Sequence, residues 1–474
     1  MPDGPGGRNG RIDATVWRVT FVAMSGSFLT LLDSTIVNVS LSSLARELRS
    51  DLSTIQWISS GYLLAMALAL PLSGWLVDRI GAKSLYLLCF AAFTASSAMC
   101  GFAWSASSLI GFRVAQGISG GLLAPMTQMM MARAAGDQMA RVMGYAAMPV
   151  LLAPILGPVI AGFILEHASW RLLFLINIPF GVLAIACAAV LLPDDSDERR
   201  SKPFDFLGFA LLSPGLVLLL YSVDRLGAAG GRTGFAVSLC LLVAFAVNAR
   251  RKTEDALINL QLFSQKDFSA AVVTQFLSNG VAFAGQMLIP FFLVRSCGLS
   301  PSRTGLMLIP LGAGMMCSYP WLGNLTDRLG IRSVSAGGAF LSALTSGPLI
   351  YLAYFGFDLV VLIPTLFLRG VGMSMIGIPS VSAAYSSIKR EDMPMASTTL
   401  NVVQRLGGPI LTTACAIFLD WRLGVTTGDR ANHAFAQTFV FLGGIQMLLY
   451  LAALRLPLRA EHDPAARREI ADLT

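Results

Sequence analysis

One carboxylate lies inside an apolar segment that is long enough to cross a bilayer. The segment, FVAMSGSFLTLLDSTIVNVSL, carries Asp33 near its middle. A charged side chain at the bilayer centre costs at least ~2.5–3.5 kcal/mol on insertion scales, so such residues are usually functional. Burial favours the protonated acid and a nearby cation favours the carboxylate, and a balanced group can bind and release a proton. We predict that Asp33 couples protons to function; the alternative is a structural ion pair that fixes helix packing.

Arg113 is the predicted counter-ion of Asp33. It lies in LIGFRVAQGISGGLLAP, together with Gln116 and Gly117, in a run whose glycines let helices approach closely. An arginine inside a bilayer faces the protein interior. A substrate carboxylate and backbone carbonyls are alternative ligands for its guanidinium. Three polar neighbours in the sequence are expected to hydrogen-bond to Asp33: Ser34, Thr35 and Asn38.

These residues must be positioned by helices that cross a membrane. The chain has 474 residues, of which 55% are hydrophobic and 13% charged, whereas soluble domains carry roughly 25% charged residues. About fourteen apolar runs reach the ~20 residues that a spanning helix needs. The sequence therefore predicts an all-α polytopic membrane protein. Every lysine, and most arginines outside the runs, fall on the side of the N-terminus, which predicts that both termini are cytoplasmic in a plasma (inner) membrane.

Two loops repeat. GWLVDRIGAKS begins at Gly74, and GNLTDRLGIRS begins 249 residues later at Gly323. A weaker echo, QGISGGLLAP against RGVGMSMIGIP, has an offset of 253 residues. Duplication predicts two six-helix bundles related by a pseudo-two-fold axis, with two extra helices, near Leu216 and Leu242, between the bundles and away from the central cavity. The predicted domains are a tail (1–14), the first bundle (15–193), a linker with the extra helices (194–267), the second bundle (268–457) and a tail (458–474).

The repeated loops are candidate gates. A carboxylate at the end of a helix can hold a neighbouring helix N-terminus and bridge to basic residues. We expect the loops to latch one conformational state through Gly74, Asp78, Arg79, Gly81, Lys83, Asp327 and Arg328. The span PVLLAPILGPVIAGFI is predicted to kink and to present a close-packed face, with a generic bent helix as the alternative. Its candidate packing residues are Pro154, Gly157, Pro158 and Gly162.

Polar residues elsewhere in the spans are candidates to line a substrate cavity, with helix–helix hydrogen bonding as the alternative role. They are Asn38, Trp57, Gln275, Asn279, Gln286, Asn401, Gln404 and Arg405. Trp57 and Tyr62 are equally expected as interfacial anchors. Ser53 and Gln56 have the spacing of a capping box that opens a helix.

Several functions are excluded by missing motifs. The chain has no phosphate-binding loop, no metal-ligand or redox cysteine spacing, and no Ser/His/Asp grouping, so we expect no enzyme activity, no metal and no cofactor. The net charge of +7 follows from the bias of basic residues toward one membrane face and does not imply a nucleic-acid partner. Energy must then come from a gradient, and a proton gradient fits Asp33.

Together these segments resemble the major facilitator superfamily, in particular its fourteen-helix drug:proton antiporter branch. LLDSTIVNVSL is similar to the helix 1 signature of that branch, GWLVDRIGAKS to the loop 2–3 motif and FRVAQGISGG to the helix 4 motif. APILGPVIAG resembles the antiporter motif of helix 5, although Ala153 and Ala161 stand where glycines are usual. WRLLFLINIPFG and NVVQRLGGPI are similar to further segments of the branch.

The resemblance implies a proton-coupled antiporter that exports small amphiphilic compounds, such as drugs, antibiotics or toxic metabolites, by alternating access. It leaves open whether a periplasmic adaptor takes part. A proton-linked importer or facilitator of a small metabolite is the alternative transporter, and a transporter-like receptor or scaffold is the alternative of another class.

Overall fold

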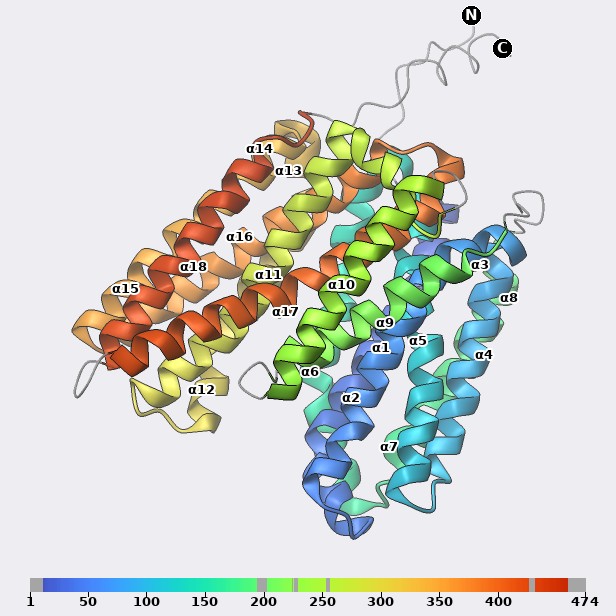
Figure 1. Ribbon diagram of the computed structural model, residues 1–474, viewed down its shortest axis with the longest axis horizontal. Coiled ribbons are helices and arrows are strands. Elements are labelled where there is room, and N and C mark those ends of the chain that lie inside the picture. Colours follow the sequence, from blue (N-terminus) through green and yellow to red (C-terminus); the bar gives the residue numbers. More distant parts are fainter. Residues whose placement is uncertain are drawn as a thin grey trace, which may run out of the picture.

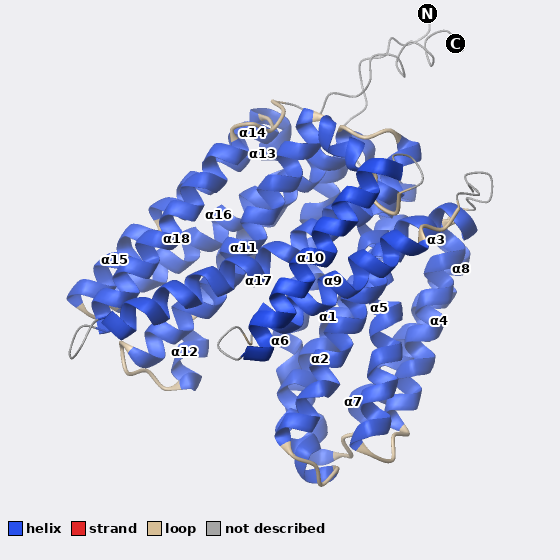
Figure 2. Cartoon of the chain, in the orientation of Figure 1, coloured by secondary structure: helices blue, strands red, loops and turns tan. Residues whose placement is uncertain are grey.

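The chain folds into two helical bundles with a helix pair between them (Figure 1). The computed structural model describes residues 12–193, 203–223, 225, 229–252, 256–425 and 431–458, and these residues contain helices and no strand (Figure 2). The first bundle consists of α1 (Ala14–Glu47), α2 (Leu52–Ala69), α3 (Ser73–Ile80), α4 (Ala82–Gly101), α5 (Ala106–Ala135), α6 (Met139–His167), α7 (Leu172–Leu175) and α8 (Asn177–Leu191). The helix pair is α9 (Phe206–Val223) and α10 (Ala229–Lys252). The second bundle consists of α11 (Lys266–Arg295), α12 (Pro301–Met307), α13 (Ile309–Leu329), α14 (Ile331–Leu344), α15 (Ser346–Phe355), α16 (Leu359–Ser386), α17 (Met393–Val425) and α18 (Ala431–Ala453).

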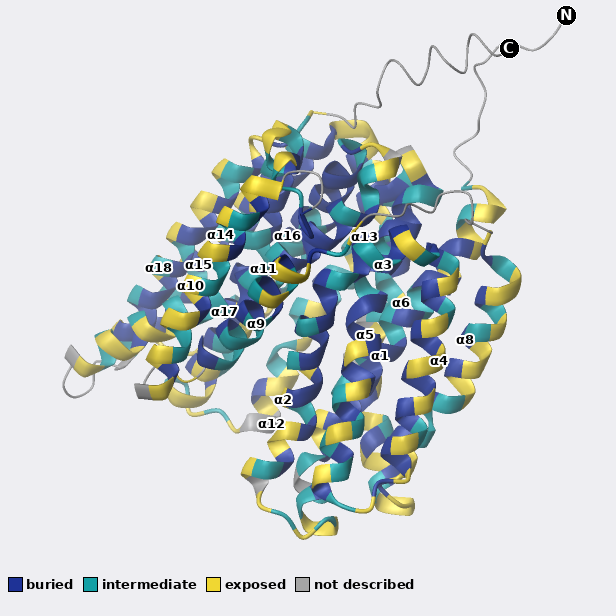
Figure 3. Cartoon of the chain, turned by 45° about the vertical axis from the view of Figure 1, so that its right-hand side comes forward, coloured by how far each residue is buried: buried dark blue, intermediate teal, exposed yellow. Residues whose placement is uncertain are grey.

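The helices have the length and the surface of membrane spans. Among the described residues, 12 helical segments are long and apolar enough to cross a bilayer. The helices α5 and α6, of 30 and 29 residues, are not among them but are also long enough to cross, so the structure is compatible with fourteen spans. Large apolar side chains such as Val190, Phe206 and Val360 are exposed. Exposed residues follow the outer faces of the helices (Figure 3), as lipid contact requires. The predicted all-α membrane fold is confirmed.

The repeated loops have the same backbone geometry. Gly81, between α3 and α4, has φ 86° and ψ 154°, and Gly330, between α13 and α14, has φ 85° and ψ 157°. A positive φ is strained for residues with a Cβ atom, so glycine is required at both turns. The shared turn explains why the sequence repeat includes this glycine.

The bundles are joined at the end where α1 begins and α18 ends, which we call the terminal end. Ser73 and Thr398 hydrogen-bond across the junction at 2.8 Å, and Ser397 donates to the carbonyl oxygen of Pro125 at 2.7 Å. Asn401 donates to Gln128 at 3.0 Å. The two bundles are therefore closed against each other at the terminal end.

Helix α9 lies across the seam between the bundles, where it contacts both α2 and α17. Ser213 donates to the carbonyl oxygen of Leu68 at 3.0 Å. Leu216 and Leu220 line a small cavity together with the side chain of Arg405 from α17. The helix pair does lie between the bundles, but α9 contributes to a cavity at their seam, which we did not expect of an accessory helix.

The first turn of α2 is capped differently from the prediction. Asp51 is the N-cap, and its carboxylate accepts from the backbone N–H of Thr54 at 2.9 Å. Hydrogen bonds from Ser53 and Thr54 lower the pKa of Asp51 to about 2. The predicted capping box of Ser53 and Gln56 is wrong, because an aspartate two residues earlier supplies a better acceptor for the free N–H groups.

Candidate functional site

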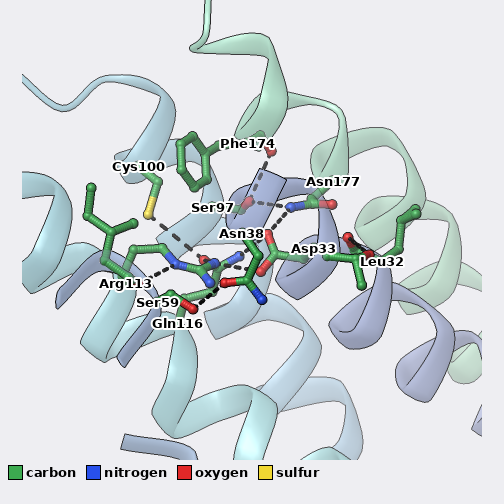
Figure 4. A network of polar contacts seen from close by, with 12 residues as sticks. Leu32, Asp33, Asn38, Ser59, Ser97, Cys100, Arg113, Gln116, Phe174 and Asn177 are labelled. Atoms are coloured by element: carbon green, nitrogen blue, oxygen red, sulfur yellow. Dashed lines mark hydrogen bonds and ion pairs between the residues drawn. The ribbon is translucent and has the colours of Figure 1, made fainter. Parts of the chain in front are cut away.

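Asp33 lies at the centre of a buried polar network formed by helices of the first bundle (Figure 4). Its Oδ2 is 2.5 Å from Nη1 of Arg113, which comes from α5. Its Oδ1 accepts from Asn177 of α8 at 2.7 Å and from Gln116 at 3.3 Å. All four residues are 0% exposed. The predicted pairing of Asp33 with Arg113 is present, and two amides complete the ligation of the carboxylate.

Arg113 is held on several sides. Its Nη1 also donates to Gln116 at 2.7 Å, and its Nε donates to the backbone carbonyl of Ile58 at 3.3 Å. The ring of Tyr62 lies 4.0 Å from the guanidinium carbon. The carbonyl contact that we offered as an alternative therefore exists beside the ion pair. These contacts fix the guanidinium while leaving the carboxylate with neutral donors as well.

The sequence reasoning missed Asn177 as a ligand of Asp33. Asn177 is the first residue of α8, and it also donates to Ser97 of α4 at 3.0 Å. Ser97 in turn donates to the carbonyl oxygen of Phe174 at 2.9 Å. One signal was available, since Asn177 is the sole strongly polar side chain within the apolar run LLFLINIPFG. Nothing in the sequence indicated that this run faces Asp33.

The three polar neighbours of Asp33 in the sequence do not bind it. Thr35 donates to backbone carbonyls, including that of Leu31 at 3.0 Å. Asn38 is exposed and accepts from Ser59 of α2. Neither Thr35 nor Ser34 contributes a hydrogen bond to the carboxylate. The prediction is wrong because residues next to each other on a helix point in different directions, whereas the interior ligands come from α5 and α8.

The small residues of the motifs separate into packing and non-packing positions. A Cβ atom on Gly117 would lie 2.4 Å from the carbonyl oxygen of Tyr62, and one on Gly157 would lie 2.3 Å from Oγ1 of Thr35. Both glycines are therefore needed for close helix contact. Gly162 is exposed and a Cβ atom on it would meet no atom of another helix within 4 Å, and Pro158 is exposed too, so the packing prediction is wrong for these two positions. Pro154 lies in α6, but its side chain is outside the described residues.

The candidate gating residues are at the terminal end, but not all cross the seam. Gly74 packs against α17, since a Cβ atom there would lie 2.9 Å from the carbonyl oxygen of Pro394. Asp327 pairs with Arg141 of α6 at 2.5 Å, which joins the two bundles. Asp78 is 7% exposed.

The basic residues of the repeated loops differ from Asp327 in their contacts. Arg79 lies over the ring of Trp75, with 5.8 Å from its Cζ to the ring centroid, and Arg328 is exposed. Lys83 donates to the carbonyl oxygen of Leu192 at 2.9 Å within the first bundle. A gating role across the seam is therefore not supported for Lys83, because its contact stays within one bundle.

Few of the cavity candidates lie free in a cavity. Gln275 is buried and donates to the carbonyl oxygen of Gly377 and to Ser380, both at 2.7 Å, so it joins α11 to α16. Asn401 belongs to the closed seam. Trp57 stacks on Tyr221 of α9, with ring centroids 6.0 Å apart. The cavity prediction is wrong for Gln275 in this conformation, because its amide is already satisfied by neighbouring helices.

Four candidates keep accessible polar groups. Gln286 is exposed, whereas Asn279, Gln404 and Arg405 are half-buried. Arg405 has no ion pair or hydrogen bond among the described residues, and it is within electrostatic reach of Tyr62. It is therefore a cation at the seam whose charge no described carboxylate compensates.

The ligands of Asp33 satisfy a buried charge. A carboxylate in low dielectric is stabilised when a cation and two amides donate to it, as Arg113, Gln116 and Asn177 do here. No group of three or more His, Cys, Asp or Glu side chains in the described part of the chain could hold a metal ion.

Comparisons with known proteins agree with this picture. The family model of the Major Facilitator Superfamily matches residues 23–412. A Mycobacterium tuberculosis protein, the multidrug resistance protein B homolog, is 32% identical over 420 residues, which cover 87% of this chain and 78% of that protein. The human organic anion transporter MFSD10 has a TM-score of 0.61 at 17% identity, with 92% of this chain and 99% of that one covered. The proton:xylose symporter XylE also has a TM-score of 0.61, at 13% identity, covering 92% and 96%. At such identities the two solved structures establish the fold alone.

Proposed function

Because this chain belongs to the major facilitator superfamily of membrane transporters, we propose that it exports small amphiphilic compounds, such as drugs, in exchange for protons. The relative from Mycobacterium tuberculosis supports the substrate class, since its name assigns it to multidrug resistance. The buried carboxylate of Asp33 supports the proton as the coupling ion. No cofactor is needed for such a cycle, because the free energy comes from the proton gradient.

The observation that carries the proposal is the fully buried pair of Asp33 and Arg113. A buried ion pair is a weak source of stability, because desolvation of both charges offsets most of their attraction. A role in which the carboxylate changes its charge gives a reason to retain it. When Asp33 binds a proton, Arg113 loses its counter-ion, and the helices that carry them can rearrange.

The closed seam between the bundles supports transport by alternating access. The bundles are closed together at the terminal end through contacts such as Ser73 with Thr398 and Arg141 with Asp327. If the termini are cytoplasmic, as the basic residues predict, this is the state closed to the cytoplasm. Protonation of Asp33 from the outside would then precede opening of the terminal end and uptake of the next substrate molecule.

The test is accumulation of a fluorescent amphiphilic dye by energised inside-out vesicles, at matched levels of protein in the membrane. Asp33→Asn is expected to abolish dye accumulation against its gradient, because an amide cannot exchange a proton. Downhill exchange of the dye should survive, since the neutral side chain resembles a permanently protonated acid. Asp33→Glu, which keeps a carboxylate, should retain part of the activity.

Glu166→Gln and Asp420→Asn are matched controls, because both acids are exposed and stand near the ends of other helices. They should transport like the unchanged protein. If Asp33→Asn still drives dye uphill and an uncoupler still collapses that gradient, Asp33 is not the proton site and one of these two acids becomes the candidate. Uphill accumulation in right-side-out vesicles alone would favour the importer.

A further inference from the structure

A groove lined by two cations opens at the terminal end of the second bundle. It lies between the start of α11, with the preceding 3-10 turn Leu260–Ser264, and the residues that follow α18. Lys266 and Arg455 line it, and both are exposed. Neither has an ion pair among the described residues. The acid closest in sequence, Asp267, does not line the groove.

The groove has both polar and apolar walls. The hydroxyls of Ser264 and Ser269 lie among its walls together with the two cations. Phe263 and Val273 supply apolar walls, and Val273 is 45% exposed on the outside of the bundle. Seven residues separate Lys266 from Val273, which is about 10 Å along a helix. The charge at the helix end and the apolar wall deeper along it follow the polarity of a phospholipid.

From this arrangement we propose that the groove binds a phospholipid with an anionic headgroup. The phosphate lies between Lys266 and Arg455, the hydroxyl of Ser269 donates to one of its oxygens, and an acyl chain follows α11 past Val273. Basic pockets between membrane helices on the cytoplasmic side suit anionic lipids, which are concentrated in that leaflet. A free phosphate ion would use the cations but would leave the apolar wall unoccupied. The lipid would bridge α11 and α18 of the same bundle, whatever the direction of transport.

Native mass spectrometry of the full-length protein, with phosphatidylglycerol or phosphatidylcholine of the same acyl chains added, tests the proposal. The unchanged protein should bind phosphatidylglycerol in preference to phosphatidylcholine. A basic residue near the surface contributes roughly a fivefold preference for anionic lipid. Arg455→Gln should therefore weaken phosphatidylglycerol binding about fivefold, and Lys266→Gln with Arg455→Gln about 25-fold.

Lys389→Gln is the matched control, because Lys389 is an exposed cation between α16 and α17 that does not line the groove. It should bind phosphatidylglycerol like the unchanged protein. Equal affinity of the double variant and the unchanged protein would overturn the proposal, as would equal losses in the control. A third arm adds inorganic phosphate: if millimolar phosphate displaces the bound lipid, the groove recognises the phosphate group alone and the lipid is not its specific ligand.

Discussion

Helices α5 and α16 occupy corresponding places in the two bundles, and each buries an arginine. Arg113 of α5 pairs with Asp33 and receives further contacts from Gln116 and Ile58. Arg369 of α16 is 1% exposed, and its two Nη atoms have no hydrogen-bond partner among the described residues. A Cβ atom on Gly285 of α11 would lie 3.0 Å from Nη2 of Arg369. The same fold therefore holds one arginine with a counter-ion and one without.

A serine of this buried network is repeated in the second bundle, whereas the acid, Asp33, is not. Ser346 stands 249 residues after Ser97, which is the offset of the repeated loops. Asn177 donates to Ser97 in the first bundle, and Ser346 donates to Gln446 at 2.6 Å in the second. The buried polar layer is thus common to both bundles, whereas the carboxylate belongs to one. The proposed proton coupling therefore rests on the first bundle, whereas the two bundles share their scaffold.

The largest expected difference between the bundles is the response to loss of each arginine. Arg113→Gln leaves the buried carboxylate of Asp33 without its cation, which costs about 3–5 kcal/mol of folding free energy. Arg369→Gln removes a buried charge that has no partner, so stability should stay the same or rise. Thermal unfolding of the two purified variants in the same detergent measures the contrast.

A double variant sharpens this first prediction, because Arg113→Gln leaves the carboxylate of Asp33 as an unpaired buried charge. Adding Asp33→Asn should restore most of the loss, because no buried charge remains. Equal destabilisation by Arg113→Gln and Arg369→Gln would mean that the arginine of the second bundle has a counter-ion too.

A smaller difference is expected for the amides. Asn177→Ala and Gln446→Ala each leave buried hydrogen-bonding groups unpaired, at a cost of about 1–3 kcal/mol. Asn177→Ala should in addition slow uphill transport, because a hydrogen-bond donor to the carboxylate of Asp33 is lost. Gln446→Ala should leave the rate of uphill transport unchanged. A loss of similar size in both variants would contradict the proposed coupling through the first bundle.

The smallest expected effects are in the repeated loops. Asp327 is 42% exposed in its pair with Arg141, and exposed pairs contribute about 0–1 kcal/mol. Asp327→Ala should therefore slow transport only slightly. Asp78 is buried at 7% exposed, so Asp78→Ala should reduce flux more strongly while substrate binding persists. Equilibrium binding and flux in one preparation test this, and equal loss of both would argue against gating.

Much of the fold could be predicted from the amino-acid sequence. Apolar runs of sufficient length predict spanning helices whatever their neighbours are, because the bilayer forces each backbone polar group to bond within its own helix. The repeated loop could be recognised because glycine alone tolerates the positive φ of Gly81 and Gly330. Asp33 and Arg113 stood out since charges in such runs are rare.

The tertiary structure decided which polar side chains meet. Asn177 reaches Asp33 across 144 residues of sequence, while Thr35, two residues away, turns to backbone carbonyls. It also decided that Gln275 joins two helices and that a Cβ atom on Gly162 would meet no atom of another described helix within 4 Å. The direction of a side chain depends on how helices are rotated and packed against one another, and single-helix periodicity does not encode that rotation. The amino-acid sequence by itself therefore determined the helices and the pair of charges, and packing determined the partners that make the pair a site.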